Sequence, residues 1–149
     1  MDDDEMQAKI AAAIEALYAE EAKIIALDIG ERTICSCFAW LLKPHFPDHS
    51  VHVEYNRRGV YPKEIELPDA EGELTDNKVF PDIIVHVPGT HDHNLLAIEI
   101  KKSTSNRSDE RDRMKLAQLR QEYGYARALF IRLSMGEDAS PGNCLFAWV

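Results

Sequence analysis

FPDIIVHVPGTHDHNLLAIEIKK, residues 80–102, is the stretch of sequence that decides the fold. Residues 83–87 are mainly β-branched, which favours a strand, and Pro88-Gly89 ends that strand. A second apolar run follows at residues 95–100 and is interrupted only by Glu99. The stretch therefore predicts two strands joined by a turn.

The charged residues of this predicted hairpin need an explanation. Side chains alternate between the faces of a strand, so Glu99 and Lys101 share one face while Ile98 and Ile100 point the other way. Burying a lone carboxylate is costly unless it is paired or bound to metal. Lys101 is the nearest candidate partner in the sequence, and a structural salt bridge with Glu99 is the simplest interpretation.

A second carboxylate favours a different interpretation. Asp82 begins the first strand, so Asp82 and Glu99 are expected on adjacent strands. Two carboxylates in that arrangement suit Mg²⁺ or Mn²⁺, which prefer oxygen ligands. Lys101 beside them would orient an attacking water and stabilise developing negative charge. The pattern predicts Asp82, Glu99 and Lys101 as catalytic residues for hydrolysis of a phosphodiester.

The order Pro81-Asp82, a turn, then Glu99-Ile100-Lys101 resembles the PD-(D/E)XK nuclease superfamily and a group of its small members. The resemblance covers roughly residues 30–133 of the chain. It implies a restriction-endonuclease-like core and a metal-dependent nuclease.

The resemblance also implies further metal ligands. The main-chain carbonyl of Ile100 would assist Asp82 and Glu99, and Glu31 at the start of a helix would be an additional ligand. Alternatively, Glu31 is only a first-turn carboxylate that favours the helix dipole. Glu54, on the strand before the hairpin, either supports this site or pairs with a neighbouring arginine.

The charge distribution suggests where a phosphate backbone would bind. The net charge of the chain is −9, but residues 99–132 hold nine basic and five acidic residues. Lys102, Arg107 and Lys115 of this stretch are therefore candidate nucleic-acid contacts, and Arg57, after the strand expected at 50–56, is a further candidate. Each also has a simpler interpretation as a surface charge, and Lys115 in particular as an i,i+3 partner of Asp112.

Size and composition predict a single domain of 149 residues, with an N-terminal helix in residues 1–27 and the core in 30–149. The chain is 45% apolar, without an apolar run near the roughly 20 residues that span a bilayer. Its start, MDDDE, is the opposite of a basic signal peptide, so we expect a cytoplasmic protein.

The remaining patterns complete an α/β (α+β) fold with a mixed four- to five-stranded sheet flanked by helices. Apolar periodicity and Gly/Pro signals predict helices and strands outside the hairpin. The expected helices are 3–27, 31–43 and 109–123, and the expected strands are 50–56, 126–133 and 143–149. Residues 59–79 are expected to form a long excursion between strands.

Two other metal interpretations have less support. His86, His91 and His93 with Asp92 could form a zinc cluster, although loop histidines without a ligand are commoner. Cys35, Cys37 and Cys144 are expected to be reduced thiols rather than zinc ligands.

The prediction is therefore a Mg²⁺- or Mn²⁺-dependent nuclease, acting on DNA in preference to RNA. A homodimer or a protein partner would supply specificity. One alternative is a non-cleaving module of the same fold that binds nucleic acid or protein. Another is an assembly protein in which Asp82, Glu99 and Lys101 form a structural ionic cluster.

Overall fold

The computed structural model describes residues 1–53, 57–58, 61–62, 64–68, 74–78 and 81–149, with side chains described in 1–53 and 81–149. The helices are α1 (Asp3–Glu20), α2 (Ala22–Ala26), α3 (Glu31–Leu42), α4 (Glu110–Tyr123) and two 3₁₀ turns (Lys43–His45 and Pro141–Asn143). The strands are β1 (Ser50–Val53), β2 (Arg57–Arg58), β3 (Tyr61–Pro62), β4 (Glu64–Pro68), β5 (Leu74–Lys78), β6 (Ile83–His86), β7 (Leu96–Lys102), β8 (Arg127–Leu133) and β9 (Leu145–Trp148).

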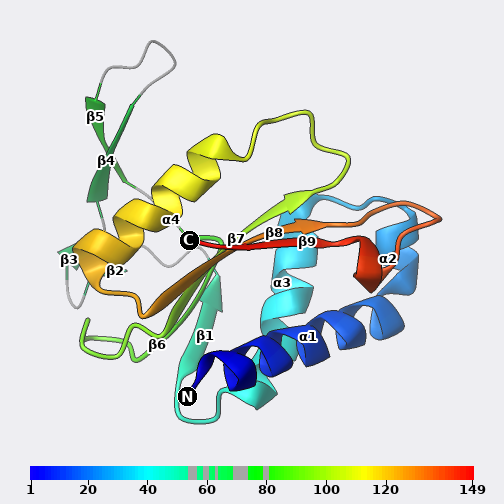
Figure 1. The fold of residues 1–149 in the computed structure, drawn as a ribbon, viewed down its shortest axis with the longest axis horizontal. Coiled ribbons are helices and arrows are strands. Elements are labelled where there is room, and N and C mark those ends of the chain that lie inside the picture. Colours follow the sequence, from blue (N-terminus) through cyan, green and yellow to red (C-terminus); the bar gives the residue numbers. More distant parts are fainter. Residues whose placement is uncertain (54–56, 59–60, 63, 69–73, 79–80) are drawn as a thin grey trace.

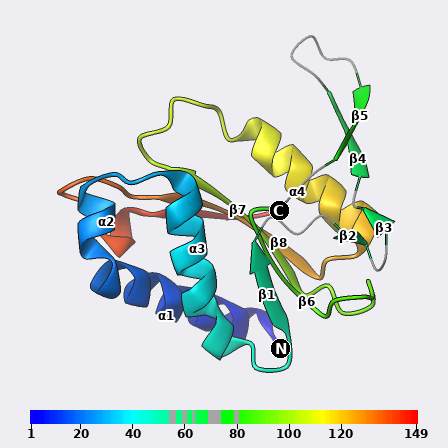
Figure 2. The ribbon, with the colours of Figure 1, turned by 180° about the vertical axis from the view of Figure 1, so that it is seen from behind.

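A five-stranded mixed sheet forms the middle layer, in the order β1-β6-β7-β8-β9. Strands β7 and β8 are parallel and the other neighbouring pairs are antiparallel. Helices α1 and α3 cover one face of the sheet and α4 covers the other, as the two opposite views show (Figures 1 and 2). The predicted α+β fold with a mixed sheet flanked by helices is confirmed.

The register of the predicted hairpin sets the position of its charged residues. Ile83 pairs with Ile98 across β6 and β7, which places Asp82 opposite Glu99. In the parallel pair, Lys101 of β7 lies beside Arg132 of β8. Because side chains alternate along strands, Asp82, Glu99 and Lys101 all lie on the α4 side.

The larger core lies between the sheet and the pair α1 and α3. Side chains from β7 and β8 on this face, such as Ile98 and Leu129, meet Leu17 of α1 and Phe38 of α3, and all four are fully buried. Burial of each such side chain stabilises the fold by about 1.5–3 kcal/mol. The α1 stripe of Met6, Ile10, Ile14 and Leu17 therefore belongs to the same core as the sheet.

The helix predicted at 3–27 differs from the structure. The single helix predicted at 3–27 divides at Glu21, whose backbone (φ −116°, ψ 29°) leaves the helical region, so that α2 takes a new direction. This turn buries Ile25, whose carbonyl accepts a hydrogen bond from Gly136 in the β8–β9 connection. Tertiary contacts at Ile25 thus outweigh the local helical propensity.

The excursion predicted at 59–79 contains regular structure in its described parts. Strands β4 and β5 form an antiparallel hairpin, with Glu64 opposite Lys78, and β3 pairs with β2, which lies just before the excursion. Strand β4 lies beside α4, and the hairpin projects from that side of the molecule (Figure 1).

The sequence predicts no membrane-spanning segment. Within the described parts of the chain, every helix is too short or too polar to cross a bilayer.

Candidate functional site

The two carboxylates of the hairpin are held by main-chain groups of each other's strand. The Ile100 N–H donates to Asp82 Oδ2 at 2.8 Å, and the Asp82 N–H donates to Glu99 Oε1 at 3.3 Å. The two side chains are thereby positioned at the same end of β6 and β7. The structure confirms that the sequence brings Asp82 and Glu99 together.

The ion pairs of the site run between β7 and α4. Glu99 pairs with Lys115 of α4 (Oε1–Nζ 2.7 Å), and Lys101 pairs with Asp112 of α4 (Nζ–Oδ2 2.5 Å). The simpler alternatives, a Glu99–Lys101 salt bridge and an i,i+3 pair of Lys115 with Asp112, are therefore not the pairings that the structure shows. Side chains two residues apart on a strand stand side by side, roughly 6.6 Å apart, whereas the facing helix offers partners directly opposite.

Lys101 has a second anchor. Its Nζ donates to the main-chain carbonyl of Ser108 at 2.8 Å, and the residue is 6% exposed. Ser108 also accepts the Glu110 N–H with its hydroxyl at 3.2 Å, so one residue starts α4 and holds the lysine. Lys101 is thus fixed on two sides beside the carboxylates.

Glu31 is the first residue of α3, which covers the opposite face of the sheet from α4, and it lies near Asp82. Burial raises the pKa of Glu31, and repulsion from Asp82 and Asp112 raises it further. Glu31 and Asp82 together line a cavity of about 300 Å³ whose other walls are Arg32, Cys35, Ser36 and Val53. The predicted involvement of Glu31 therefore has a geometric basis.

Electrostatics at Glu99 favour a bound positive charge. The residue is 3% exposed, and burial raises its pKa well above the usual range, with repulsion from Asp82 as the next cause. Attraction to Lys115 opposes this increase without cancelling it. Ionising a buried carboxyl next to a second carboxylate is unfavourable, so an additional positive charge beside Glu99 would be favourable.

Lys115 shows the complementary effect. Burial alone would lower its pKa, but attraction to Glu99, and then to Asp82 and Asp112, raises it in net. Lys115 therefore stays charged and acts as a counter-ion for the carboxylates. Carboxylate oxygens are the ligands that Mg²⁺ and Mn²⁺ prefer, but among the described residues no three His, Cys, Asp or Glu side chains are placed to hold a metal ion.

The other predicted nucleic-acid contacts are not gathered at the carboxylates. Lys102 points toward the α2–α3 connection, where its Nζ pairs with Asp28 Oδ1 at 3.0 Å and lowers the pKa of that carboxyl. Arg107 is exposed in the loop between β7 and α4. The side chain of Arg57 and the whole of Glu54 lie outside the described residues.

Most other basic residues of the 99–132 stretch hold the fold together. Arg132 donates to the carbonyls of Lys102, Ser105 and Arg107, which shapes the loop before α4. Arg120 donates to Tyr125, Ala126 and Val149, Arg127 pairs with Asp3, and Arg113 pairs with Asp109. Because most of these basic side chains contact other parts of the protein, the net positive charge of residues 99–132 is only weak evidence for a phosphate-binding surface.

The zinc interpretations gain no support. His86 is buried and its Nε2 lies 2.8 Å from Nδ1 of His52, whereas His91 and His93 are exposed in the turn. In the parts of the chain that are described, no three His, Cys, Asp or Glu side chains form a ready-made metal-binding group. The cysteines in the structure are free thiols.

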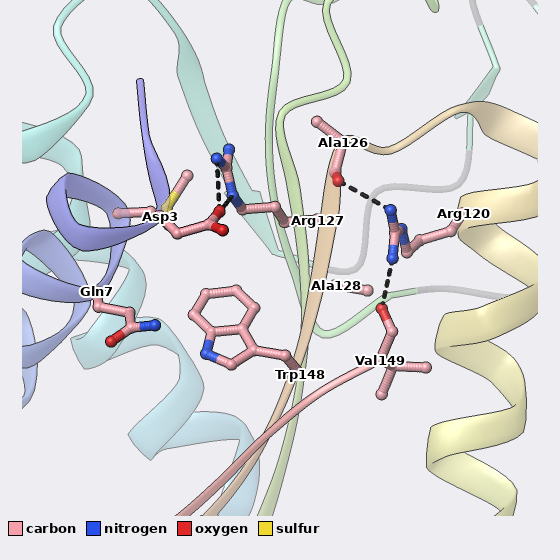
Figure 3. A pocket seen from close by; sticks show the side chains of 9 residues that line it. Asp3, Gln7, Arg120, Ala126, Arg127, Ala128, Trp148 and Val149 are labelled. Carbon is pink, nitrogen blue, oxygen red and sulfur yellow. Dashed lines mark hydrogen bonds and ion pairs between the residues drawn. The ribbon is translucent and has the colours of Figure 1, made fainter.

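A larger cavity of about 490 Å³ lies away from these residues, between α1, α4, β8 and β9 (Figure 3). Its charged side chains are engaged with the protein, since Arg127 pairs with Asp3 at 2.9 Å and Arg120 donates to the Val149 carbonyl at 2.8 Å. Trp148 forms part of the wall. Neither Asp82 nor Glu31 lines this larger cavity, whereas both line the smaller one.

Sequence reasoning missed the roles of Asp112, Ser108 and Arg132. The signal for Asp112 and Lys115 was their spacing, since both fall on the side of α4 that also presents Leu116 and Leu119 to the sheet. Charged residues that share the buried side of a helix require buried partners. Ser108 acts through its main chain and Arg132 through loop carbonyls, and neither contact has a signature in the sequence.

No protein-family model and no curated protein sequence matches the chain. Among solved structures, the chain is similar to the protein described as "Crystal structure of SSO0001", with 15% identity and a TM-score of 0.46. The alignment covers 95% of this chain and 64% of that one, so this chain spans less than two thirds of its length. A likeness at this level assigns neither a family nor an activity.

Proposed function

We propose that this protein is a Mg²⁺- or Mn²⁺-dependent nuclease of the PD-(D/E)XK type that hydrolyses phosphodiester bonds, in DNA rather than RNA. One observation carries the proposal. Asp82 and Glu99 lie opposite each other on adjacent strands, and Lys101 lies on the same face of the sheet. Two carboxylate ligands and a neighbouring ammonium group suit such hydrolysis.

The energetics of Glu99 support a functional role. Burying an ion pair often contributes little or nothing to stability compared with apolar residues of the same size. Here the buried Glu99 also has a second carboxylate beside it, which makes its environment still less favourable for negative charge. Retaining such a pair is more easily explained by cation binding than by stability, and pKa values perturbed in this way cluster at functional sites.

Asp82 and Glu99 would hold the cation, with Glu31 and the main-chain carbonyl of Ile100 as the proposed additional ligands. When bound, Mg²⁺ or Mn²⁺ would make water a stronger acid and offset negative charge on the phosphate. Lys101, held by Ser108 and Asp112, would orient the attacking water and stabilise charge that develops on the phosphoryl oxygens.

Substrate binding would draw on basic residues around this end of the sheet. Arg107 is exposed in the loop before α4, and Lys115 lies next to the carboxylates. Arg57 and Lys102 remain proposed contacts, although Lys102 would first have to leave Asp28. A homodimer or a partner protein would supply sequence specificity, in the cytoplasm.

The test is cleavage of a panel of single-stranded, double-stranded and branched DNA and RNA with Mn²⁺ or Mg²⁺. Asp82→Asn and Lys101→Met remove a proposed ligand and the proposed charge-stabilising lysine with little change in shape, and both should lower the cleavage rate at least a hundredfold, in line with losses at comparable sites. Lys43→Met, an exposed lysine at the end of α3, is the charge-matched control and should cleave like the wild type.

Circular dichroism and thermal unfolding would establish that each variant is folded. Cleavage that persists in Asp82→Asn would contradict the proposal, because it would come from another site or another protein. Absence of cleavage on all substrates, together with absence of metal binding, would also contradict it.

One observation favours a non-cleaving module as the second candidate. Glu99 and Lys101 of β7 already have partners on α4, so the cluster contains two ion pairs between β7 and α4. In a purely structural cluster, Asp82→Asn would leave metal binding unchanged and Lys101→Met would destabilise the protein strongly.

A further inference from the structure

We propose that the outer edge of β9 is the surface through which two copies of this chain associate, by antiparallel pairing of β9 with β9 about a two-fold axis at Ala147. This edge lies on the far side of β8 from the carboxylates of β6 and β7. The proposal therefore does not depend on the proposed nuclease activity, and it assigns the expected homodimer to one defined surface.

Strand β9 is an edge with an unusually apolar surface. It is the last strand of the five-stranded sheet in the part of the chain that the structure describes. Its large side chains are at the surface, with Leu145, Phe146 and Trp148 exposed by 46%, 42% and 41%. Natural sheets usually protect an edge with charged residues, proline or a bulge. The sequence of β9, LFAW, contains neither a charged residue nor a proline, so this edge is open to pairing with another strand.

The main-chain hydrogen bonds of β9 show which residues would pair. The Val149 N–H donates to the carbonyl of Ala128 in β8 at 3.0 Å. In antiparallel strands, the residues that bond to one neighbouring strand alternate with those that point away from it. The N–H and C=O groups of Phe146 and Trp148 therefore point away from β8, toward the outer edge.

The same two residues share one face of the sheet. Phe146 and Trp148 stand opposite Ile131 and Leu129 of β8, which belong to the core under α1. Figure 3 shows Trp148 on the side of β9 that faces α1. A groove of about 440 Å³ lies there, lined by Gln7, Ile10, Ala11, Phe146 and Trp148. A second strand at this edge would have to present side chains of matching direction to the groove.

The contacts of Cys144 select one register for self-pairing. A two-fold axis at Phe146 would pair Trp148 with Cys144 of the second copy, but the Cys144 N–H already donates to the Pro141 carbonyl at 3.3 Å. An axis at Ala147 instead pairs Phe146 with Trp148 of the second copy, on both sides of the axis. This register joins the outward main-chain groups of both residues and forms two cross-strand aromatic pairs, which are favourable in sheets.

The charge distribution favours a second copy at this edge over one elsewhere on the surface. The net charge of the chain is −9, so two copies repel each other in general. Residues 139–149, ASPGNCLFAWV, contain no Asp, Glu, Lys or Arg, so pairing this edge with itself brings no like-charged side chains together. An axis perpendicular to the sheet also keeps α4 of both copies on the same side of the joined sheet.

The first test is the mass in solution, measured by analytical ultracentrifugation between about 1 μM and 1 mM. The wild type should approach the mass of two chains as the concentration rises. Trp148→Glu places a carboxylate in the aromatic pair and should weaken association at least about tenfold. Trp40→Glu is the matched control, because Trp40 is 80% exposed on α3, and it should associate like the wild type.

A disulfide tests the register. Opposed residues of a non-hydrogen-bonded antiparallel pair have Cα atoms about 4.5 Å apart, which suits a disulfide. Ala147→Cys should therefore form a covalent dimer under mild oxidation. Leu145→Cys is the control, because the register puts the two introduced thiols four residues apart along the strands, roughly 13 Å, and it should cross-link no more than the wild type.

Amide hydrogen exchange of the wild type, followed by NMR, does not depend on whether any variant folds. The amides of Phe146 and Trp148 should exchange at least about tenfold more slowly at the highest concentration than at the lowest. The Val149 amide, which is bonded within its own chain, should change little. A wild type that stays monomeric at about 1 mM would overturn the proposal. A dimer in which the exchange of Phe146 and Trp148 is unchanged would also overturn it. All these measurements are made without metal or nucleic acid, so their outcome is separate from that of the cleavage test.

Discussion

The two faces of the central sheet are built from the same strands and differ in character. The face under α1 and α3 carries the larger apolar core, which includes Ile98 and Ile100 of β7. The face under α4 is apolar at one end, where Ala97 meets Leu116, and charged at the other, where Glu99 and Lys101 meet α4.

The difference teaches that one strand can serve stability and chemistry at once. Strand alternation sends neighbouring residues of β7 to opposite layers, so the large core is not interrupted by the charges. The α1 and α3 layer supplies stability, whereas the charged end of the α4 layer contributes less stability than apolar residues would. Each of the following predictions tests one side of this contrast.

The largest effect is expected in the apolar layer. Phe38→Ala removes a fully buried ring from α3 and should lower the free energy of unfolding by about 3–5 kcal/mol, measured by urea denaturation. Trp40→Ala on the same helix is the control, because Trp40 is 80% exposed, and should cost less than about 0.5 kcal/mol. Equal effects of the two substitutions would contradict the assignment of this face as the core.

A smaller effect is expected where a buried ion pair is broken. Lys115→Met leaves Glu99 without its counter-ion and should lower the free energy of unfolding at pH 7 by about 2–3 kcal/mol, less than for a fully buried pair because Lys115 is partly exposed. Glu99→Gln combined with Lys115→Met should recover most of this loss. Equal losses in the single and double variants would show that Lys115 acts through packing and not through charge.

The pH dependence of stability tests the charged layer under α4 and leaves the packing of both layers in place. The pKa of Glu99 in the folded protein is raised above its usual value. At pH values between the unfolded and the folded pKa, the folded state therefore binds more protons than the unfolded state. Stability from this group is complete below the unfolded value of about 4.5 and is lost as the pH rises through the folded pKa.

Urea denaturation in EDTA should therefore show the wild type losing stability relative to Glu99→Gln as the pH rises above 4.5, by at most about 1.4 kcal/mol per pH unit. EDTA is needed because a bound cation would favour the ionised carboxylate and hide the effect. A difference between the two proteins that grows in favour of the wild type with rising pH would have the wrong sign and would contradict the raised pKa.

The smallest effect is expected at the surface of α4. Asp109 and Arg113 form an exposed i,i+4 pair at 3.1 Å, so Arg113→Ala should change the free energy of unfolding by about 0.5 kcal/mol or less. The measurement is thermal unfolding at low and high salt. A loss above 1 kcal/mol would show that the contact of Arg113 with the Phe130 ring matters more than the ion pair.

Local sequence patterns accounted for the elements and for the faces of the strands. The β-branched run after Pro81 and the apolar run around Glu99 became β6 and β7, and the helix expected at 109–123 became α4, which ends at Gly124 in the left-handed conformation. The alternation along β7 correctly placed Glu99 and Lys101 on one face. These features depend on neighbouring residues, which the sequence specifies directly.

The tertiary structure determined which charged side chains pair with one another. The sequence placed Lys101 two residues from Glu99, yet packing of α4 against the sheet gave Glu99 to Lys115 and Lys101 to Asp112. It also directed Lys102 toward Asp28 and divided the N-terminal helix at Glu21. The partners in an ion pair depend on how helices and strands that are distant in the sequence pack together. This packing depends on whole layers of the fold and not on local sequence spacing.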